Sequence, residues 1–115
     1  MIYHKLTNAN ASLITATTTA SSLKDLIDAA AATGDFNIDG LDGADLLIET
    51  AQTVRILFDG TTPTTAKGIL MAQNNKLMLR NTDLSKVRII TTAATCAIGI
   101  QVGKSSPGET TVWSV

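Results

Sequence analysis

Aromatic residues are scarce in this chain, and their scarcity limits what it can bind. Phe, Trp and Tyr make up 3% of the 115 residues, whereas proteins that hold single-stranded nucleic acid stack the bases on exposed rings. Nine Lys and Arg residues are scattered among ten Asp and Glu, and the formal net charge is −1. A nucleic-acid-binding protein instead clusters basic residues to displace counterions from phosphates. We therefore expect no nucleic-acid partner.

Cysteine and long apolar runs are also lacking. The lone Cys96 excludes an internal disulfide framework and a zinc site built on several cysteines. No run reaches the roughly 18 apolar residues of a transmembrane helix. Residues 1–10 lack the charged-then-apolar pattern of a secretory signal. These absences predict a protein that is made in the cytoplasm, has no membrane partner and is not secreted.

The chain is instead rich in Thr, Ser and Asn beside Ala, Ile, Leu and Val. Hydrophobic residues make up 44% and charged residues 17%. β-branched side chains pack well on the half-buried surface of a sheet. At this length we expect a single domain, 1–115, with a core large enough to hold the fold. Its surface should be polar but weakly charged, which suits contact with neighbouring molecules.

One short helix is expected near residues 22–32. Its apolar stripe has the i, i+3, i+4, i+7 spacing and consists of Leu23, Leu26, Ile27 and Ala30. Ser21 or Ser22 can cap the first turn, and Gly34 is a natural stop. The helix should therefore lie on the rest of the domain by one face.

The remaining chain alternates between short strand-like segments and turns. The clearest alternation is at 95–102, where one face carries Cys96, Ile98, Ile100 and Val102. Other strands are expected at 12–19, 45–50, 53–58, 68–72, 76–80 and 87–91, with a last strand or tail at 110–114. The 68–72 and 76–80 segments flank Asn74-Asn75 and should form a hairpin. About seven short strands with one helix predict a mainly β fold, an antiparallel β-sandwich or barrel.

The Gly103-Lys104-Ser105 tripeptide is similar to the end of a phosphate-binding loop. Such a loop needs an earlier glycine where this chain has Ile98, and it must open a helix, whereas Pro107 and Gly108 follow here. We therefore interpret Lys104 as a lysine in a turn.

The acidic residues Asp39, Asp42 and Asp45, with Glu49 downstream, suggest a calcium loop. Calcium takes several oxygen ligands from a glycine-containing loop, but the three-residue spacing differs from that of an EF-hand and the closing Glu comes too early. Asp-Gly pairs also build ordinary turns. We interpret the cluster as solvated turns.

The single histidine, His4, is the one residue that could serve as the histidine of a His–Cys or His–Ser catalytic pair, and Cys96 is the one thiol. A triad needs a nucleophile beside the histidine and an acid behind it. Cys96 falls on an apolar strand face, where a free thiol behaves as a small hydrophobe. We therefore interpret His4 as an ordinary residue of an N-terminal strand, and a small hydrolase is kept as the alternative to a non-enzymatic protein.

A cross-strand ion pair is expected among Arg55, Asp83 and Arg88, worth under about 1 kcal/mol at the surface. Taken together, these four features assign no catalytic, cofactor-binding or metal-binding residue. We expect the chain to be no enzyme and to need no cofactor.

The middle of the chain nevertheless has a recognisable pattern. Residues 54–70 read V-R-x-x-x-D-G-x-x-P-T-x-x-x-G-x-L, and Asp83-Leu84-Ser85-Lys86 and Arg88-Ile89-Ile90 follow before a strand that ends at Val102-Gly103. This pattern, over about 54–103, resembles small virion structural proteins of tailed bacteriophages, of the capsid decoration or cement kind. The segment 1–44 matches nothing comparable.

The resemblance implies a mainly β protein of the virion, made in the host cytoplasm, without catalytic residues. Its partners would be the major capsid protein or other virion proteins, and we expect a homo-oligomer. The alternatives are a head–tail or tail accessory protein and a host- or carbohydrate-binding β-sandwich module. Residues 12–20 and 110–115 are the candidate contact strands, because exposed strand edges can pair with other chains.

We predict from the sequence that deleting residues 107–115 leaves a folded domain that no longer joins particles. The folded state would be checked by circular dichroism and incorporation by analysis of purified particles. Unchanged incorporation would contradict a contact role for this segment.

Overall fold

Two antiparallel sheets form most of the computed structural model, which describes residues 6–30 and 38–114. The five-stranded sheet has the order β1 (Thr7–Ala16), β8 (Cys96–Lys104), β3 (Gly43–Ile48), β6 (Lys76–Leu79) and β9 (Val112–Ser114). The four-stranded sheet has the order β2 (Ser21–Ser22), β7 (Arg88–Thr91), β4 (Val54–Leu57) and β5 (Ile69–Met71). A 3₁₀ turn, η1 (Leu84–Lys86), precedes β7.

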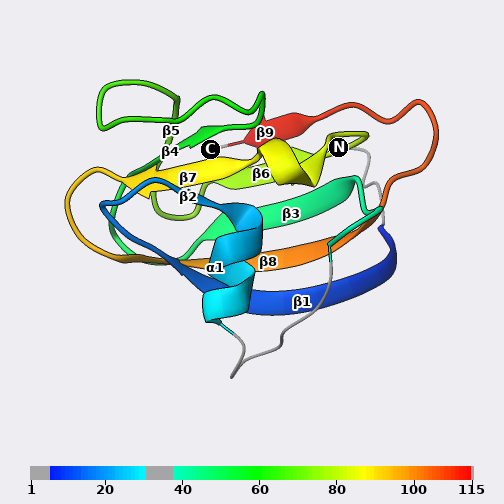
Figure 1. Ribbon diagram of the computed structural model, residues 1–115, viewed down its shortest axis with the longest axis horizontal. Coiled ribbons are helices and arrows are strands. Elements are labelled where there is room, and N and C mark those ends of the chain that lie inside the picture. Colours follow the sequence, from blue (N-terminus) through cyan, green and yellow to red (C-terminus); the bar gives the residue numbers. More distant parts are fainter. Residues whose placement is uncertain (1–5, 31–37, 115) are drawn as a thin grey trace.

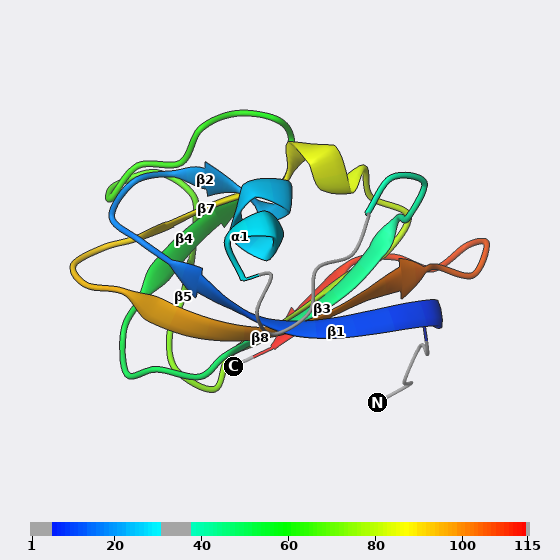
Figure 2. The same ribbon diagram turned by 60° about the horizontal axis from the view of Figure 1, so that its bottom comes forward.

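The two sheets are stacked in a sandwich-like arrangement, and α1 (Leu23–Ala29) lies above the five-stranded sheet next to β2 (Figures 1 and 2). One apolar core cluster contains buried residues of both sheets and of α1. The prediction of a mainly β, antiparallel fold with one short helix is confirmed.

The alternation of β8 is confirmed residue by residue. Its inward side chains Cys96, Ile98, Ile100 and Val102 are all buried. On either side β8 pairs with β1 and β3, so that Ile98 lies between Ile14 and Ile48, both of which are fully buried. These three strands therefore form the apolar floor of the core.

The helix begins where the sequence indicates but is shorter. Ser22 is its N-cap, and the Ser22 hydroxyl accepts a hydrogen bond from the Asp25 N–H at 3.1 Å. Leu23, Leu26 and Ile27 are buried, as the stripe predicts. The helix ends at Ala29, and the predicted stop at Gly34 lies outside the described residues.

The predicted hairpin around Asn74-Asn75 is wrong. β5 pairs with β4 in one sheet, whereas β6 pairs with β3 and β9 in the other, so the chain crosses between sheets here. Asn75 directs this crossing: its Oδ1 accepts from the Ala72 N–H at 2.7 Å, and its carbonyl accepts from the Ile48 N–H at 3.1 Å. The Asn74 N–H donates to the Ile48 carbonyl, which holds the crossing to the end of β3.

The other expected strands are present with shifted bounds. β1 starts earlier than expected and ends at Ala16, because Thr17 and Thr19 form a local turn in which the Thr19 N–H donates to the Thr17 hydroxyl at 3.2 Å. The C-terminal segment is a strand, β9, rather than a tail. Within the described ranges no helix has the length and apolarity needed to span a bilayer.

The core position of β8 gives a stability prediction. Replacing fully buried Ile98 by Ala should lower the free energy of unfolding by about 2–5 kcal/mol, because it removes buried methyl groups and leaves a cavity. The matched control on the same strand is exposed Gln101→Ala, with an effect within about 0.5 kcal/mol. Urea denaturation followed by circular dichroism would measure both, and equal effects would contradict the assigned faces of β8.

Candidate contact surface

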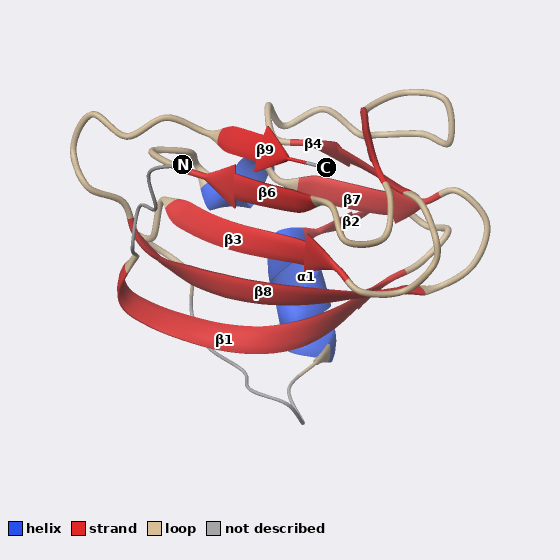
Figure 3. Cartoon of the chain, turned by 180° about the vertical axis from the view of Figure 1, so that it is seen from behind, coloured by secondary structure: helices blue, strands red, loops and turns tan. Residues whose placement is uncertain are grey.

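The candidate contact surface is the face of the five-stranded sheet that is turned away from the four-stranded sheet. Figure 3 shows it in front, with α1 behind. We call it the outer face and define it by the outward residues of its strands: Ala11, Leu13, Thr15, Asp45, Leu47, Glu49, Lys76, Met78, Ala97, Gly99, Gln101 and Val112.

Apolar and small side chains occupy most of the outer face. One row crosses the sheet through Leu13, Gly99 and Leu47, which are paired in register on β1, β8 and β3. Leu13 is 45% exposed and Val112 is 39% exposed. These two large apolar side chains lie on the two outermost strands, β1 and β9, so each edge of the outer face carries an exposed apolar side chain. The row of Leu13 reaches Lys76 on β6, and the row of Val112 reaches Asp45 on β3.

Glu49 modifies the middle of this face. A Cβ added to Gly99 would collide with the Glu49 carboxylate, so the Glu49 side chain lies across β8 at this point. A side chain at position 99 would therefore displace the flexible end of Glu49. The charges of the outer face are thus few: Glu49, Lys76 on β6, and Asp45, which is held by an ion pair.

The outer face is small for a protein interface. Its strands contain 10, 9, 6, 4 and 3 residues; at about 3.3 Å per residue along a strand and about 4.8 Å per strand across the sheet, they cover roughly 500 Å². A stable protein–protein contact buries about 800 Å² on each partner. One such face is therefore expected to make a weak contact on its own.

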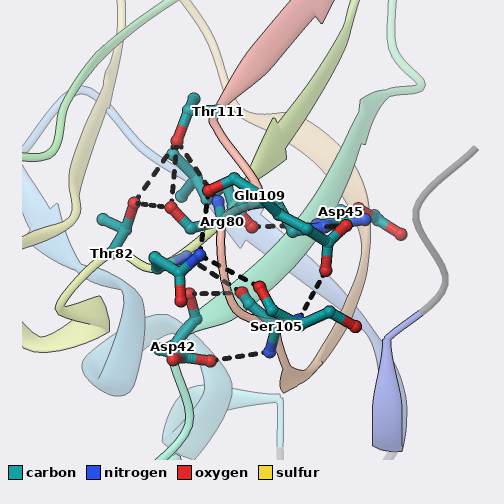
Figure 4. A network of polar contacts seen from close by, with 10 residues as sticks. Asp42, Asp45, Arg80, Thr82, Ser105, Glu109 and Thr111 are labelled. Atoms are coloured by element: carbon teal, nitrogen blue, oxygen red, sulfur yellow. Dashed lines mark hydrogen bonds and ion pairs between the residues drawn. The ribbon is translucent and has the colours of Figure 1, made fainter. Parts of the chain in front are cut away.

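One end of the outer face is closed by a cluster around Arg80, shown in Figure 4. The Arg80 side chain follows outward Met78 on β6, yet it is fully buried. Its Nη1 forms an ion pair with Asp45 at 2.8 Å, and its Nε lies 3.6 Å from a Glu109 carboxylate oxygen. The Glu109 side chain is also almost fully buried. Two carboxylates therefore compensate one buried guanidinium.

Hydrogen bonds tie the β8–β9 loop to this cluster. The Asn81 side-chain amide donates to the carbonyls of Ser106 and Glu109, at 3.2 and 2.8 Å. The Arg80 N–H donates to the Thr111 hydroxyl at 3.2 Å. Asn81 has a φ of 50°, a left-handed conformation that asparagine tolerates. The loop is thus fixed just before β9, which sets where Val112 enters the outer face.

The structure gives the Gly103-Lys104-Ser105 tripeptide a role in the same region. The Ser105 N–H donates to the Asp42 carboxylate at 2.7 Å, and the Ser105 hydroxyl donates to the Asp42 carbonyl at 3.1 Å. The Lys104 ammonium donates to the Gly40 carbonyl at 3.1 Å. These contacts hold two loops together, and a turn rather than a helix follows at Pro107.

The acidic residues of the proposed calcium loop do not converge. Asp42 accepts from Ser105, Asp45 pairs with Arg80, and Glu49 lies over Gly99. Throughout residues 6–30 and 38–114, no group of three His, Cys, Asp or Glu side chains is arranged to hold a metal ion. The interpretation as solvated turns is wrong for Asp45, which lies in β3 and pairs with a buried cation.

Cys96 is fully buried in the apolar core, and its thiol donates to the Ala97 carbonyl at 3.6 Å. Burial raises the pKa of the Cys96 thiol, which disfavours the reactive thiolate. His4 lies outside the described residues. The surroundings of Cys96 are therefore those of a packed hydrophobe rather than of a nucleophile.

The predicted ion pair among Arg55, Asp83 and Arg88 is not formed. Arg55 donates to the backbone carbonyls of Thr65, at 3.3 Å, and Gly68, at 3.0 Å. Asp83 caps η1 instead, accepting from the N–H and hydroxyl of Ser85. Arg55 and Asp83 are thus bonded to groups of nearby turns rather than to each other.

The two candidate contact segments lie at opposite edges of the same sheet. Residues 12–16 of the first belong to β1, and residues 112–114 of the second form β9. The composition of each segment predicts exposure, but the sequence does not show that both segments belong to the same sheet. Both contribute to the outer face, through Leu13 and Val112.

Comparison of the chain with protein-family models, with curated protein sequences and with solved structures finds no match in any of the three.

The Arg80 cluster changes the deletion prediction made from the sequence. Residues 107–115 include Glu109 and Thr111, so deleting them removes one of the two carboxylates beside a buried guanidinium. Loss of one partner of a buried ion pair costs about 3 kcal/mol or more. We now expect this deletion to destabilise the domain.

Glu109→Ala tests this assignment directly. We expect it to lower the free energy of unfolding by about 3 kcal/mol, since the Arg80 guanidinium loses a buried counterion. The control is Asp28→Ala, which removes an exposed ion pair with Lys24 and should cost under about 1 kcal/mol. Urea denaturation would measure both, and a Glu109 effect no larger than that of Asp28 would contradict the role of the cluster.

Proposed function

We propose that this chain is a structural protein of a tailed-bacteriophage particle, specifically a capsid decoration or cement protein that binds the lattice of the major capsid protein. The resemblance over residues 54–103 suggested this class. The observation that carries the proposal is the outer face: a regular sheet surface with Leu13 and Val112 exposed at its two edges and with one of its three charged residues, Asp45, held in an ion pair.

The size of the outer face supports a repetitive partner. A contact of roughly 500 Å² per copy is weak for a single pair of molecules. On a lattice, or between copies of a homo-oligomer, many such contacts act together, and linked contacts gain avidity without any new interaction. A decoration protein works under this condition, because each copy is surrounded by the same partner surface.

The alternative of a carbohydrate-binding module has less support. Sugar rings usually stack on exposed aromatic side chains. Phe58 is the aromatic residue whose side chain falls within the described part of the chain, and it is half-buried against the core. The outer face, which offers Leu, Met, Ala and Val, is better suited to a protein surface.

Leu13→Lys tests the outer face. We expect the variant to fold normally, because an exposed substitution changes stability by less than about 0.5 kcal/mol, and to lose capsid binding, because it buries a charge in the contact. Leu70→Lys is the matched control: Leu70 is 53% exposed on β5, an edge strand of the four-stranded sheet. Co-sedimentation of each purified variant with phage heads, and their thermal melts, are the measurements.

Equal loss of binding in both variants, or unchanged binding of Leu13→Lys, would contradict the assignment of the outer face. Sedimentation with tails and not with heads would favour the tail accessory alternative over decoration. The gene neighbourhood gives a second criterion, since a decoration protein should be encoded beside a major capsid protein and a tail accessory protein among tail genes.

A further inference from the structure

The outer face is arranged almost evenly about its middle strand. β3 has β8 and β1 on one side and β6 and β9 on the other (Figure 3). One row of outward residues, which we call the central row, runs through Leu13, Gly99, Leu47 and Lys76. Leu47 lies on β3, with Gly99 one strand away on one side and Lys76 one strand away on the other. β3 is therefore the strand about which this face can be paired with a copy of itself.

Two opposite charges on the outer face lack partners. Glu49 and Lys76 are both exposed, and within the part of the chain that the structure describes neither side chain forms an ion pair or a hydrogen bond. The Glu49 carboxylate lies over Gly99 on β8, whereas Lys76 belongs to β6, on the other side of β3. A carboxylate and a cation, one strand to either side of β3, are thus available to a partner.

A two-fold axis that runs along β3, above the outer face, brings these charges together. It places β8 of one copy opposite β6 of the other, and it keeps each row opposite the same row. The Glu49 carboxylate over Gly99 then faces Lys76 of the second copy, and because such a contact is isologous the same pair forms twice. An axis across the strands, along the central row, would instead place Lys76 opposite itself. The charges therefore favour the axis along β3.

The shape of the sheet allows this packing. β-sheets are twisted, and a rotation by 180° about the direction of the middle strand carries a twisted sheet onto one of the same twist, so the two faces stay parallel. Leu47 then packs against Leu47 of the second copy at the centre. In the next row, Val112 of each copy meets Ala11 of the other. Apolar contacts thus lie between and beside the two ion pairs.

Asp45 is the charged residue of the outer face that this axis places opposite itself. Its carboxylate already forms an ion pair with the buried Arg80 guanidinium at 2.8 Å, and its side chain is only 23% exposed. The negative charge near the axis is therefore compensated within each chain, and it opposes the contact much less than an unpaired carboxylate would.

We propose that in solution the outer face pairs with the outer face of a second copy, about a two-fold axis along β3, with Leu47 at the centre and two ion pairs between Glu49 and Lys76. Two faces of roughly 500 Å² bury roughly 1,000 Å² together, which suits a weak, reversible dimer. The capsid lattice would compete with the second copy for this face. The dimer concerns the purified chain alone and does not rest on the virion assignment.

Sedimentation equilibrium of the purified chain, in about 50 mM salt to limit screening, tests the pairing. We expect the wild-type chain to dimerise with a Kd on the order of 0.1 mM. E49K and K76E should each raise this Kd about tenfold or more, because each places like charges opposite one another. Both positions are exposed, so both variants should keep the fold, which circular dichroism and thermal melts would check.

Mixing the two variants is the decisive experiment. In a mixed dimer both pairs again have opposite charges, so a trace of fluorescently labelled E49K titrated with K76E should associate within about threefold of the wild-type Kd. An ion pair inside one chain would not be restored by mixing. K67E is the matched control for net charge: Lys67 is exposed in the loop between β4 and β5 of the four-stranded sheet. It should bind labelled E49K about fivefold or more weakly than K76E does, because one of its two pairs stays like-charged.

Three results would overturn the proposal. A wild-type chain that stays monomeric up to about 1 mM would show that the faces do not pair. Dimerisation of E49K and K76E with the wild-type Kd would assign the contact to another surface. Binding of K76E to labelled E49K no tighter than that of K67E would show that only net charge matters. None of these measurements includes phage heads, so a failure here is separate from a failure of capsid binding.

Discussion

The pairing of β8 with β1 and β3 is the constraint on which the rest of the molecule depends. In register across these strands, Ile14, Ile98 and Ile48 face the core, and the neighbouring row through Leu13 and Gly99 faces outward. A shift by one residue would exchange the two faces and expose the core row. The same register therefore determines both the stability of the sandwich and the composition of the outer face.

This register also creates a difficulty, which the β8–β9 loop resolves. Arg80 follows β6 on the outward side, where a charged residue is ordinarily solvated, but here the side chain is fully buried. A buried charge is tolerated only when it is paired, and the carboxylates of Asp45 and Glu109 provide the pairing. Because Glu109 belongs to the loop, the ion cluster also fixes the path into β9 and the position of Val112.

Local pattern was sufficient for some elements of the fold. The alternation of 95–102 and the stripe of Leu23, Leu26 and Ile27 each predicted the buried side of one element, because the period of a strand or helix is a local property. Strand partners are not local. The 68–72 and 76–80 segments are close enough in sequence for a hairpin, yet Asn75 bonds to the end of β3 and sends them to different sheets.

The candidate sites were less predictable than the fold, for a related reason. Alternation predicts that Arg80 is exposed, and no spacing in the sequence connects it to Asp45 or Glu109. The cluster forms only because three distant segments meet at one end of the sheet.

The residues of the 54–70 sequence pattern have local structural roles instead. Arg55 binds the carbonyls of a neighbouring loop, and Gly68 has a φ of 129°, so these residues of the pattern maintain turns rather than a binding surface.

The two sides of the five-stranded sheet differ in what lies against them. The outer face lies on one side, and α1 with a cavity beside residues 38–41 and η1 lies on the other (Figures 1 and 3). Between them lies the apolar core, which is close-packed and has little freedom to rearrange. Substitutions on the outer face and beside the cavity should therefore change the free energy of unfolding independently of one another.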